Sequence, residues 1–159
     1  SILVYINMIK PYVFLLIVMM TQNLFSQIKV APVNPLWTRK IDSALSIVKK
    51  YDSDYYDTII KYCKSIGFWR GNFSTVENNI EEITISVNEI NNSCINNIAA
   101  ILVHESTHLY FIKNKRNYPI EYEEMLCYQT EKYFLKKIPN VETFLLENVE
   151  YQIKQFERD

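Results

Sequence analysis

An apolar run that ends in a pair of histidines constrains this chain more than any other feature. Residues 98–103 are all apolar and read as a buried helix, and His104, Glu105 and His108 follow directly. Residues four apart lie on one face of a helix, so both imidazoles can point toward the same ion. Glu105 lies beside them, where its carboxylate can take a proton from metal-bound water. The pattern therefore predicts a metal site on a buried helix.

Chance rarely produces this pattern in so short a chain. The sequence of 159 residues has only two histidines, and both belong to the pattern. At the usual frequencies of His and Glu, a chance match has a probability on the order of half a per cent. Two histidines packed in a core without a metal are the alternative, but two imidazoles on an apolar face are costly to bury unpaired. The pattern favours a metal ion.

A catalytic zinc site needs a third protein ligand besides a water molecule. No histidine remains to supply it, and Phe111 and Asn114 stand where a glycine and a third histidine would follow in one common extension of the pattern. The third ligand is therefore a carboxylate or, less favourably, a thiolate. The next predicted helix carries the candidates: Glu121, Glu123, Glu124, Cys127 and Glu131.

Glu124 is the carboxylate best suited to this role. Two apolar residues follow it, which indicates partial burial, and a buried carboxylate needs a partner that a dication supplies. Glu121 and Glu123 are expected on a solvated face. Three residues lie three, four and seven positions after Glu124 and so share one helical face with it: Cys127, Tyr128 and Glu131.

These residues resemble those of a small gluzincin-type zinc metallopeptidase, of the kind known from compact bacterial members. The resemblance covers roughly residues 80–138 and implies that His104, His108 and Glu124 bind the metal. It also implies that Glu131 supports the ligands or faces the substrate. Gluzincins often have an aspartate four residues after the ligand glutamate, bonded to a ligand histidine. Tyr128 stands there, so the partner of the imidazole is left open.

The resemblance implies zinc-dependent hydrolysis of peptide bonds, with one Zn²⁺ ion as cofactor and a peptide or protein as substrate. Glu105 is the expected general base, which takes a proton from the metal-activated water and passes it to the leaving nitrogen. The oxyanion needs a further donor, and the candidates are Tyr118, Tyr122 and Arg116. A zinc-stabilised binding or scaffold domain without turnover is the alternative, although such a domain has no need of Glu105.

Hydrophobic periodicity predicts an α+β fold that is mostly helical. Helices are expected at 36–50, 52–64, 120–137 and 141–157, with the motif helix running from Ser93 or Asn96 to about Lys113. By the resemblance, the fold is zincin-like, with a small sheet before the motif helix and a glutamate-bearing helix after it.

The expected sheet is represented by one clear strand. Residues 83–88 alternate apolar and polar side chains, as in a half-buried strand that could pair with an extended peptide at its edge. Gly67 is expected to end the second helix, and Ser53 or Asp54 to begin it. Residues 68–73 are expected to form a loop or short strand.

The N-terminal segment predicts export. Lys10 precedes about ten apolar residues, and a small residue before a polar one follows, which together describe a secretory signal peptide over residues 1–26. A membrane span needs about twenty apolar residues, so this segment is short for one. We expect translation to start at Met8 and the product to be periplasmic or extracellular. An uncleaved membrane anchor is the alternative, because Leu24 is large for a residue near a cleavage point.

Composition favours one globular domain over residues 27–159. Apolar residues make up 48% of the chain, enough for a core, and the net charge of -1 offers no basic surface for nucleic acid or membranes. The cysteines match no paired-cysteine zinc pattern. In an exported protein Cys63 and Cys94 could form a disulfide, but three separate buried thiols are the simpler expectation.

Overall fold

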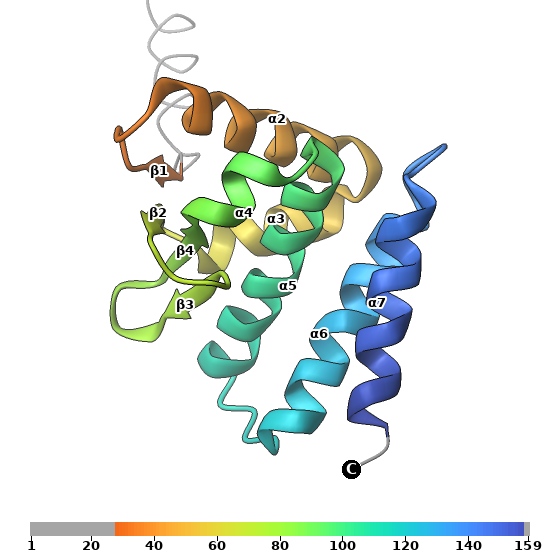
Figure 1. Cartoon of the computed structure of the whole chain (residues 1–159). Coiled ribbons are helices and arrows are strands. Elements are labelled where there is room, and N and C mark those ends of the chain that lie inside the picture. The colour runs from red at the N-terminus through yellow and green to blue at the C-terminus, as the bar shows by residue number, and fades with distance from the viewer. Residues whose placement is uncertain (1–27, 158–159) are drawn as a thin grey trace, which may run out of the picture.

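The computed structural model describes residues 28–157, so the signal peptide expected at 1–26 lies outside the described residues. Within them the chain has the expected α+β class, mostly helical, with a four-stranded sheet on one side (Figure 1). No helix in this described part is long and apolar enough to cross a membrane.

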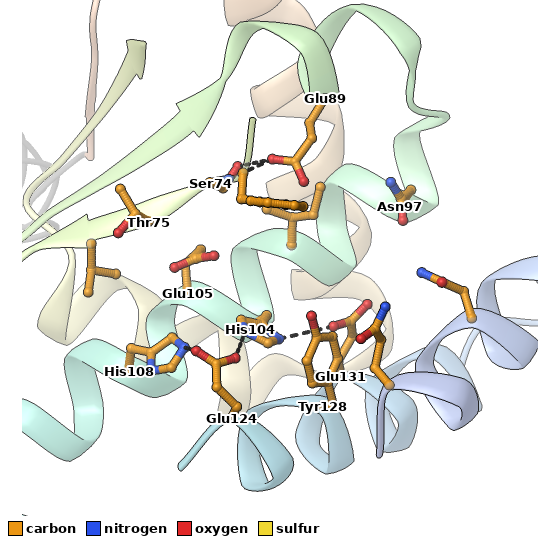
Figure 2. A pocket seen from close by; sticks show the side chains of 15 residues that line it. Ser74, Thr75, Glu89, Asn97, His104, Glu105, His108, Glu124, Tyr128 and Glu131 are labelled. Atoms are coloured by element: carbon orange, nitrogen blue, oxygen red, sulfur yellow. Dashed lines mark hydrogen bonds and ion pairs between the residues drawn. The ribbon is translucent and has the colours of Figure 1, made fainter. Parts of the chain in front are cut away.

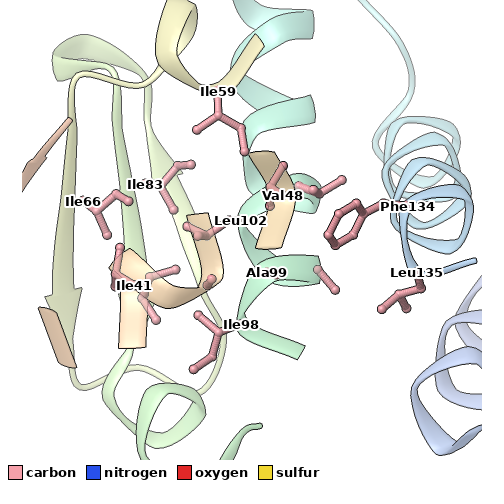
Figure 3. Packing of buried hydrophobic residues seen from close by; sticks show 14 of the residues in the cluster. Ile41, Val48, Ile59, Ile66, Ile83, Ile98, Ala99, Leu102, Phe134 and Leu135 are labelled. Atoms are coloured by element: carbon pink, nitrogen blue, oxygen red, sulfur yellow. The ribbon is translucent and has the colours of Figure 1, made fainter. Parts of the chain in front are cut away.

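Helix α5, Ile95–Lys113, forms the centre of the structure. Apolar residues cover nearly its whole circumference, as expected of a helix surrounded by other elements. The sheet packs on one side of it, while Phe134 and Leu135 approach from the other (Figure 3). Leu102 and Ala99 are fully buried between these two sides. The histidine motif therefore lies on a helix that other elements pack against on both sides.

The other helices agree with the sequence periodicity to within two residues at each end, apart from α4. Asn34 caps the first of them by accepting a hydrogen bond from the Leu36 amide at 2.8 Å. Asp52 caps the second through the Tyr55 amide, in place of the expected Ser53 or Asp54. The bounds are α2 (Pro35–Tyr51), α3 (Ser53–Tyr62), α4 (Val87–Asn92), α6 (Ile120–Leu135) and α7 (Thr143–Phe156).

The sheet is larger than the sequence predicted. Its order is β1-β2-β4-β3, with β3 antiparallel to β4 and the other neighbours parallel. The expectation that the predicted strand pairs with a peptide is wrong, because β4 already has a neighbour on each side. The strand at the edge of the sheet next to β4 is β3. The bounds are β1 (Lys29–Val30), β2 (Ser65–Trp69), β3 (Thr75–Glu77) and β4 (Glu82–Ser86), with a short 3₁₀ turn, η1, at Asn78–Ile80.

Gly67 does not end a helix, as expected from the sequence, but lies in the middle of β2. A Cβ atom at this position would lie 2.6 Å from the Glu82 carboxylate oxygen on the neighbouring strand. That carboxylate accepts a hydrogen bond from the Ser65 hydroxyl at 2.6 Å. Glycine is therefore favoured here by the close approach of a side chain, and α3 ends earlier, at Tyr62.

Candidate metal centre

Two adjacent helices supply the residues of the site. His104, Glu105 and His108 lie on α5, and Glu124 lies on α6, which packs along α5 (Figure 2). Nε2 of His104 is 3.3 Å from one oxygen of the Glu124 carboxylate, and Nε2 of His108 is 3.4 Å from the other. Both rings thus direct the same nitrogen toward one carboxylate. The structure brings together the three residues expected to bind the metal.

These distances fit a shared metal ion. Bonds of about 2.0–2.1 Å in a tetrahedron place neighbouring ligand atoms about 3.3–3.4 Å apart. The separations of Glu124 from His104 and His108, 3.3 and 3.4 Å, are of this order, each to a different oxygen of the carboxylate. The donor set of two imidazoles and a carboxylate is one that divalent transition metals accept. Each histidine faces a different oxygen of Glu124, so one carboxylate lies within reach of both rings.

Each imidazole is oriented by a second carboxylate. Nδ1 of His104 lies 3.2 Å from Glu131, and Nδ1 of His108 lies 2.7 Å from Glu123. Metal-binding histidines usually have such a partner on their other nitrogen. The expectation that Glu123 lies on a solvated face is wrong, because its side chain is only 21% exposed. Tyr128 packs its ring edge-on against His104, at 4.5 Å between centroids.

The ionisation of these groups reflects their contacts in the absence of a metal. Burial disfavours the charged form of His104, but contacts with Glu124 and Glu131 outweigh it and raise its pKa to about 10. Burial would also raise the pKa of Glu124, but the two histidines lower it to about 2. Without metal, the pocket is therefore a network of charged imidazoles and carboxylates.

Glu105 has the environment of a general base. Burial raises its pKa to about 7, against the opposing charges of His104 and His108. A proton acceptor works best when its pKa lies near the working pH. The side chain is 7% exposed and lines a cavity together with both histidines. Its carboxylate therefore faces this cavity.

The cavity measures about 580 Å³ and is open to the surface. Helices α5, α6 and α7 line it on one side, and residues 73–76, which include part of β3, line the other. Glu89 of α4 holds this second side: its Oε2 accepts hydrogen bonds from the Ser74 amide at 2.8 Å and from the Ser74 hydroxyl at 2.5 Å. Sequence reasoning missed Glu89 and Ser74, because no motif links them to the histidines.

The expected oxyanion donors lie elsewhere. The ring of Tyr118 packs against Phe111 and Tyr122, and Tyr122 is 46% exposed. Arg116 is exposed in the loop after α5. Among the described residues around the cavity, none of the three expected donors is present, and Tyr128 is the one tyrosine that lines it.

The back of the motif helix is fixed by Tyr55 of α3. Its hydroxyl lies against that of Thr107 and donates to the Val103 carbonyl oxygen at 3.1 Å. Burial raises the pKa of Tyr55 to about 12, so it remains a donor at neutral pH. Only the folding of α3 against α5 brings Tyr55 there, so no spacing along the chain predicts this contact.

All three cysteines are free thiols. Cys63 and Cys127 are buried as expected, whereas Cys94 is partly exposed. Cys127 lies on α6 and is fully buried. One ligand atom from each of His104, His108 and Cys127 lies within 4.8 Å of the others. This buried group could hold a metal ion, which makes the thiol a second candidate for the third ligand beside Glu124.

Comparisons with known proteins do not identify the chain. No protein-family model matches the sequence, and no curated protein shows significant similarity to it. The resemblance to gluzincins therefore stays a prediction that depends on the histidine motif and on Glu124.

Proposed function

We propose that the protein is a zinc-dependent metallopeptidase. The observation that carries this proposal is the convergence of His104, His108 and Glu124, beside a cavity into which the Glu105 carboxylate points. His104, His108 and Glu124 would hold the ion, and a set of three protein ligands beside a water molecule is the one that catalytic zinc sites use. A purely structural site has no use for a buried carboxylate next to that position.

Glu105 performs the proton transfers in this proposal. A bound zinc ion supplies Lewis acidity and lowers the pKa of water at its open position. Glu105, whose carboxylate is buried beside both histidines, would accept the proton of the attacking water and return it to the leaving nitrogen. Glu131 and Glu123 hold the imidazoles in place throughout. Tyr128, which lines the cavity, replaces the distant tyrosines as the candidate donor to the oxyanion.

The substrate in this proposal is an extended peptide that pairs with β3. This strand is paired with β4 on one side only, and its residues Thr75 and Val76 line the cavity. An edge strand presents unpaired amides and carbonyls that can bind a peptide backbone. The described lining includes Glu89 and Glu131 and neither Lys nor Arg, so positively charged peptides are favoured over acidic ones. On the prediction of a signal peptide, this activity belongs to the periplasm or the extracellular space.

Replacement of the base tests the proposal. We expect Glu105→Gln to bind zinc as well as the wild type but to lose at least about a hundredfold of its hydrolysis rate, because Gln cannot accept the proton. The assay is a library of fluorogenic peptides that includes Lys- and Arg-containing members. Zinc is measured in the same samples.

Two results would contradict the proposal that the protein is a zinc-dependent metallopeptidase. Equal background cleavage by both proteins, with zinc retained in both, would leave a zinc-stabilised binding or scaffold domain. Less than about 0.2 equivalents of zinc in gently purified protein, without uptake of added zinc, would remove the metal site altogether.

A further inference from the structure

Cys127 is a buried reactive group that the proposed hydrolysis does not use. Its side chain has no exposed surface, and a ligand atom from each motif histidine lies within 4.8 Å of its sulfur. The Cys63 thiol donates to the Ser65 carbonyl oxygen at 3.1 Å, whereas no residue between 28 and 157 provides such a partner for the Cys127 thiol. An unpartnered thiol beside two imidazoles is an arrangement suited to a metal ion.

Glu124 and Cys127 approach the same two rings from different depths. They lie three residues apart on α6 and so share one face of the helix. Glu124 lines the cavity, whereas Cys127 does not, and it lies sealed between α5 and α6. The carboxylate thus offers a ligand atom on the cavity side of the rings, and the sulfur offers one that the cavity does not reach.

We propose that Cys127 is an alternative third ligand that gives the site a second, closed mode of binding for thiophilic metal ions. In this mode a soft ion such as Cd²⁺ is held by His104, His108 and the Cys127 thiolate, while Glu124 is released. Zinc, in the open mode, uses Glu124. The inference rests on the metal site of the proposed function but not on peptidase activity.

The chemistry of the second mode is a simple exchange. A metal–sulfur bond and two metal–nitrogen bonds would form, the S–H bond and the Nε2–H bonds of the charged imidazoles would break, and these protons would pass to the solvent, with no change in oxidation state. Burial and nearby carboxylates raise the pKa of Cys127, so the thiol is neutral before metal arrives. Thiolate ligands select soft ions, whereas carboxylates select harder ones. The two ligands on one helical face therefore distinguish metal ions by their softness.

Titration with Cd²⁺ tests the inference, because a cadmium–thiolate bond produces a charge-transfer absorption in the ultraviolet. We expect the wild type and Glu124→Gln to develop this band up to one ion per chain, and Cys127→Ser to lose it. Cys63→Ser and Cys94→Ser are the matched controls and keep it. Cd²⁺ affinity should fall at least about tenfold in Cys127→Ser, since even loss of an outer partner costs that much.

Far-ultraviolet circular dichroism shows whether each variant is folded, and Cys127→Ala replaces the serine variant if that one is not. A band that persists in the folded Cys127 variant, or that is absent from the wild type, overturns the inference. Peptidase activity is not measured in this experiment. If the zinc protein fails to cleave peptides while the band depends on Cys127, the proposed function fails and the second metal mode stands.

Discussion

Glu124 is the residue that decides whether the site holds a metal in the open mode. Its two oxygens lie 3.3 and 3.4 Å from the histidine nitrogens, whereas Glu131 contacts only the far nitrogen of His104. We expect Glu124→Ala to lose most of its zinc on dialysis. Glu131→Ala should retain zinc with an affinity about 10- to 100-fold lower. Inductively coupled plasma mass spectrometry of the dialysed proteins measures the difference, and the reverse order would make Glu131 the ligand.

Glu123 is a residue whose role depends on one hydrogen bond. Its carboxylate lies 2.7 Å from Nδ1 of His108, while Glu121, two residues earlier, is exposed. We expect Glu123→Ala to weaken zinc binding about 10- to 100-fold, because the imidazole loses the group that orients it. Glu121→Ala is the matched control and should bind like the wild type. Competition with a chromophoric chelator measures both affinities, and equal values for the two variants would refute this role.

At the scale of elements, strand β3 depends on α4 for its position. The Glu89 carboxylate accepts two hydrogen bonds from Ser74, directly before β3. Hydrogen bonds to a charged group are worth about 1.5–3 kcal/mol each, less where water reaches them. We expect Glu89→Ala to lower the free energy of unfolding by about 1–3 kcal/mol and to raise KM for peptides several-fold, with zinc content unchanged. Urea unfolding and steady-state kinetics provide the measurements.

The exposed neighbour Asn88 gives the control for this prediction. Asn88→Ala changes the same helix without reaching Ser74, so both its stability and its KM should match the wild type. If Glu89→Ala alters kcat and zinc content but leaves KM unchanged, then Glu89 acts on the metal site and not on the strand.

The elements that sequence predicted well are those whose apolar periodicity is long. Helices α5, α6 and α7 each extend over at least three turns, so their faces were evident from spacing alone. The strand β3 has three residues and α4 has six, too few for a period to be read. Gly67 of β2 resembled the end of a helix in the sequence. The contact that favours glycine there comes from Glu82 on another strand, which the sequence does not reveal. Short elements are determined by their neighbours in space, which the sequence does not reveal.

The same distinction applies to the site at the scale of the whole molecule. His104, Glu105 and His108 were found because spacing along one helix brings them together, and Glu124 was found from the apolar residues that follow it and from the resemblance. Glu123 and Cys127 gained their contacts from the way α6 packs against α5, a relation that periodicity within one helix does not contain. Glu89 required the sheet, α4 and α5 to be assembled first. Sequence reasoning therefore named Glu123 and Cys127 only among the candidate ligands, without their contacts, and missed Glu89.

The stability of the whole metal-free protein should depend on pH through this network. The pKa of His104 is raised from its usual 6.5 to about 10, so its contribution is complete below pH 6.5 and is lost as the pH rises to 10. Glu105, raised from 4.5 to about 7, acts in the same direction over a lower range. Glu124, lowered to about 2, loses its contribution only as the pH falls from 4.5 toward 2.

We therefore expect the metal-free protein to be most stable near pH 5–6 and to lose stability steadily toward pH 10. Zinc should reverse this trend, because its ligands must be deprotonated and its binding strengthens as protons leave. Urea unfolding at pH 5, 7 and 9, with a chelator and with saturating zinc, measures both curves. Metal-free stability that is constant or rises between pH 6 and 9 would show that His104 is not held in its charged form by Glu124 and Glu131.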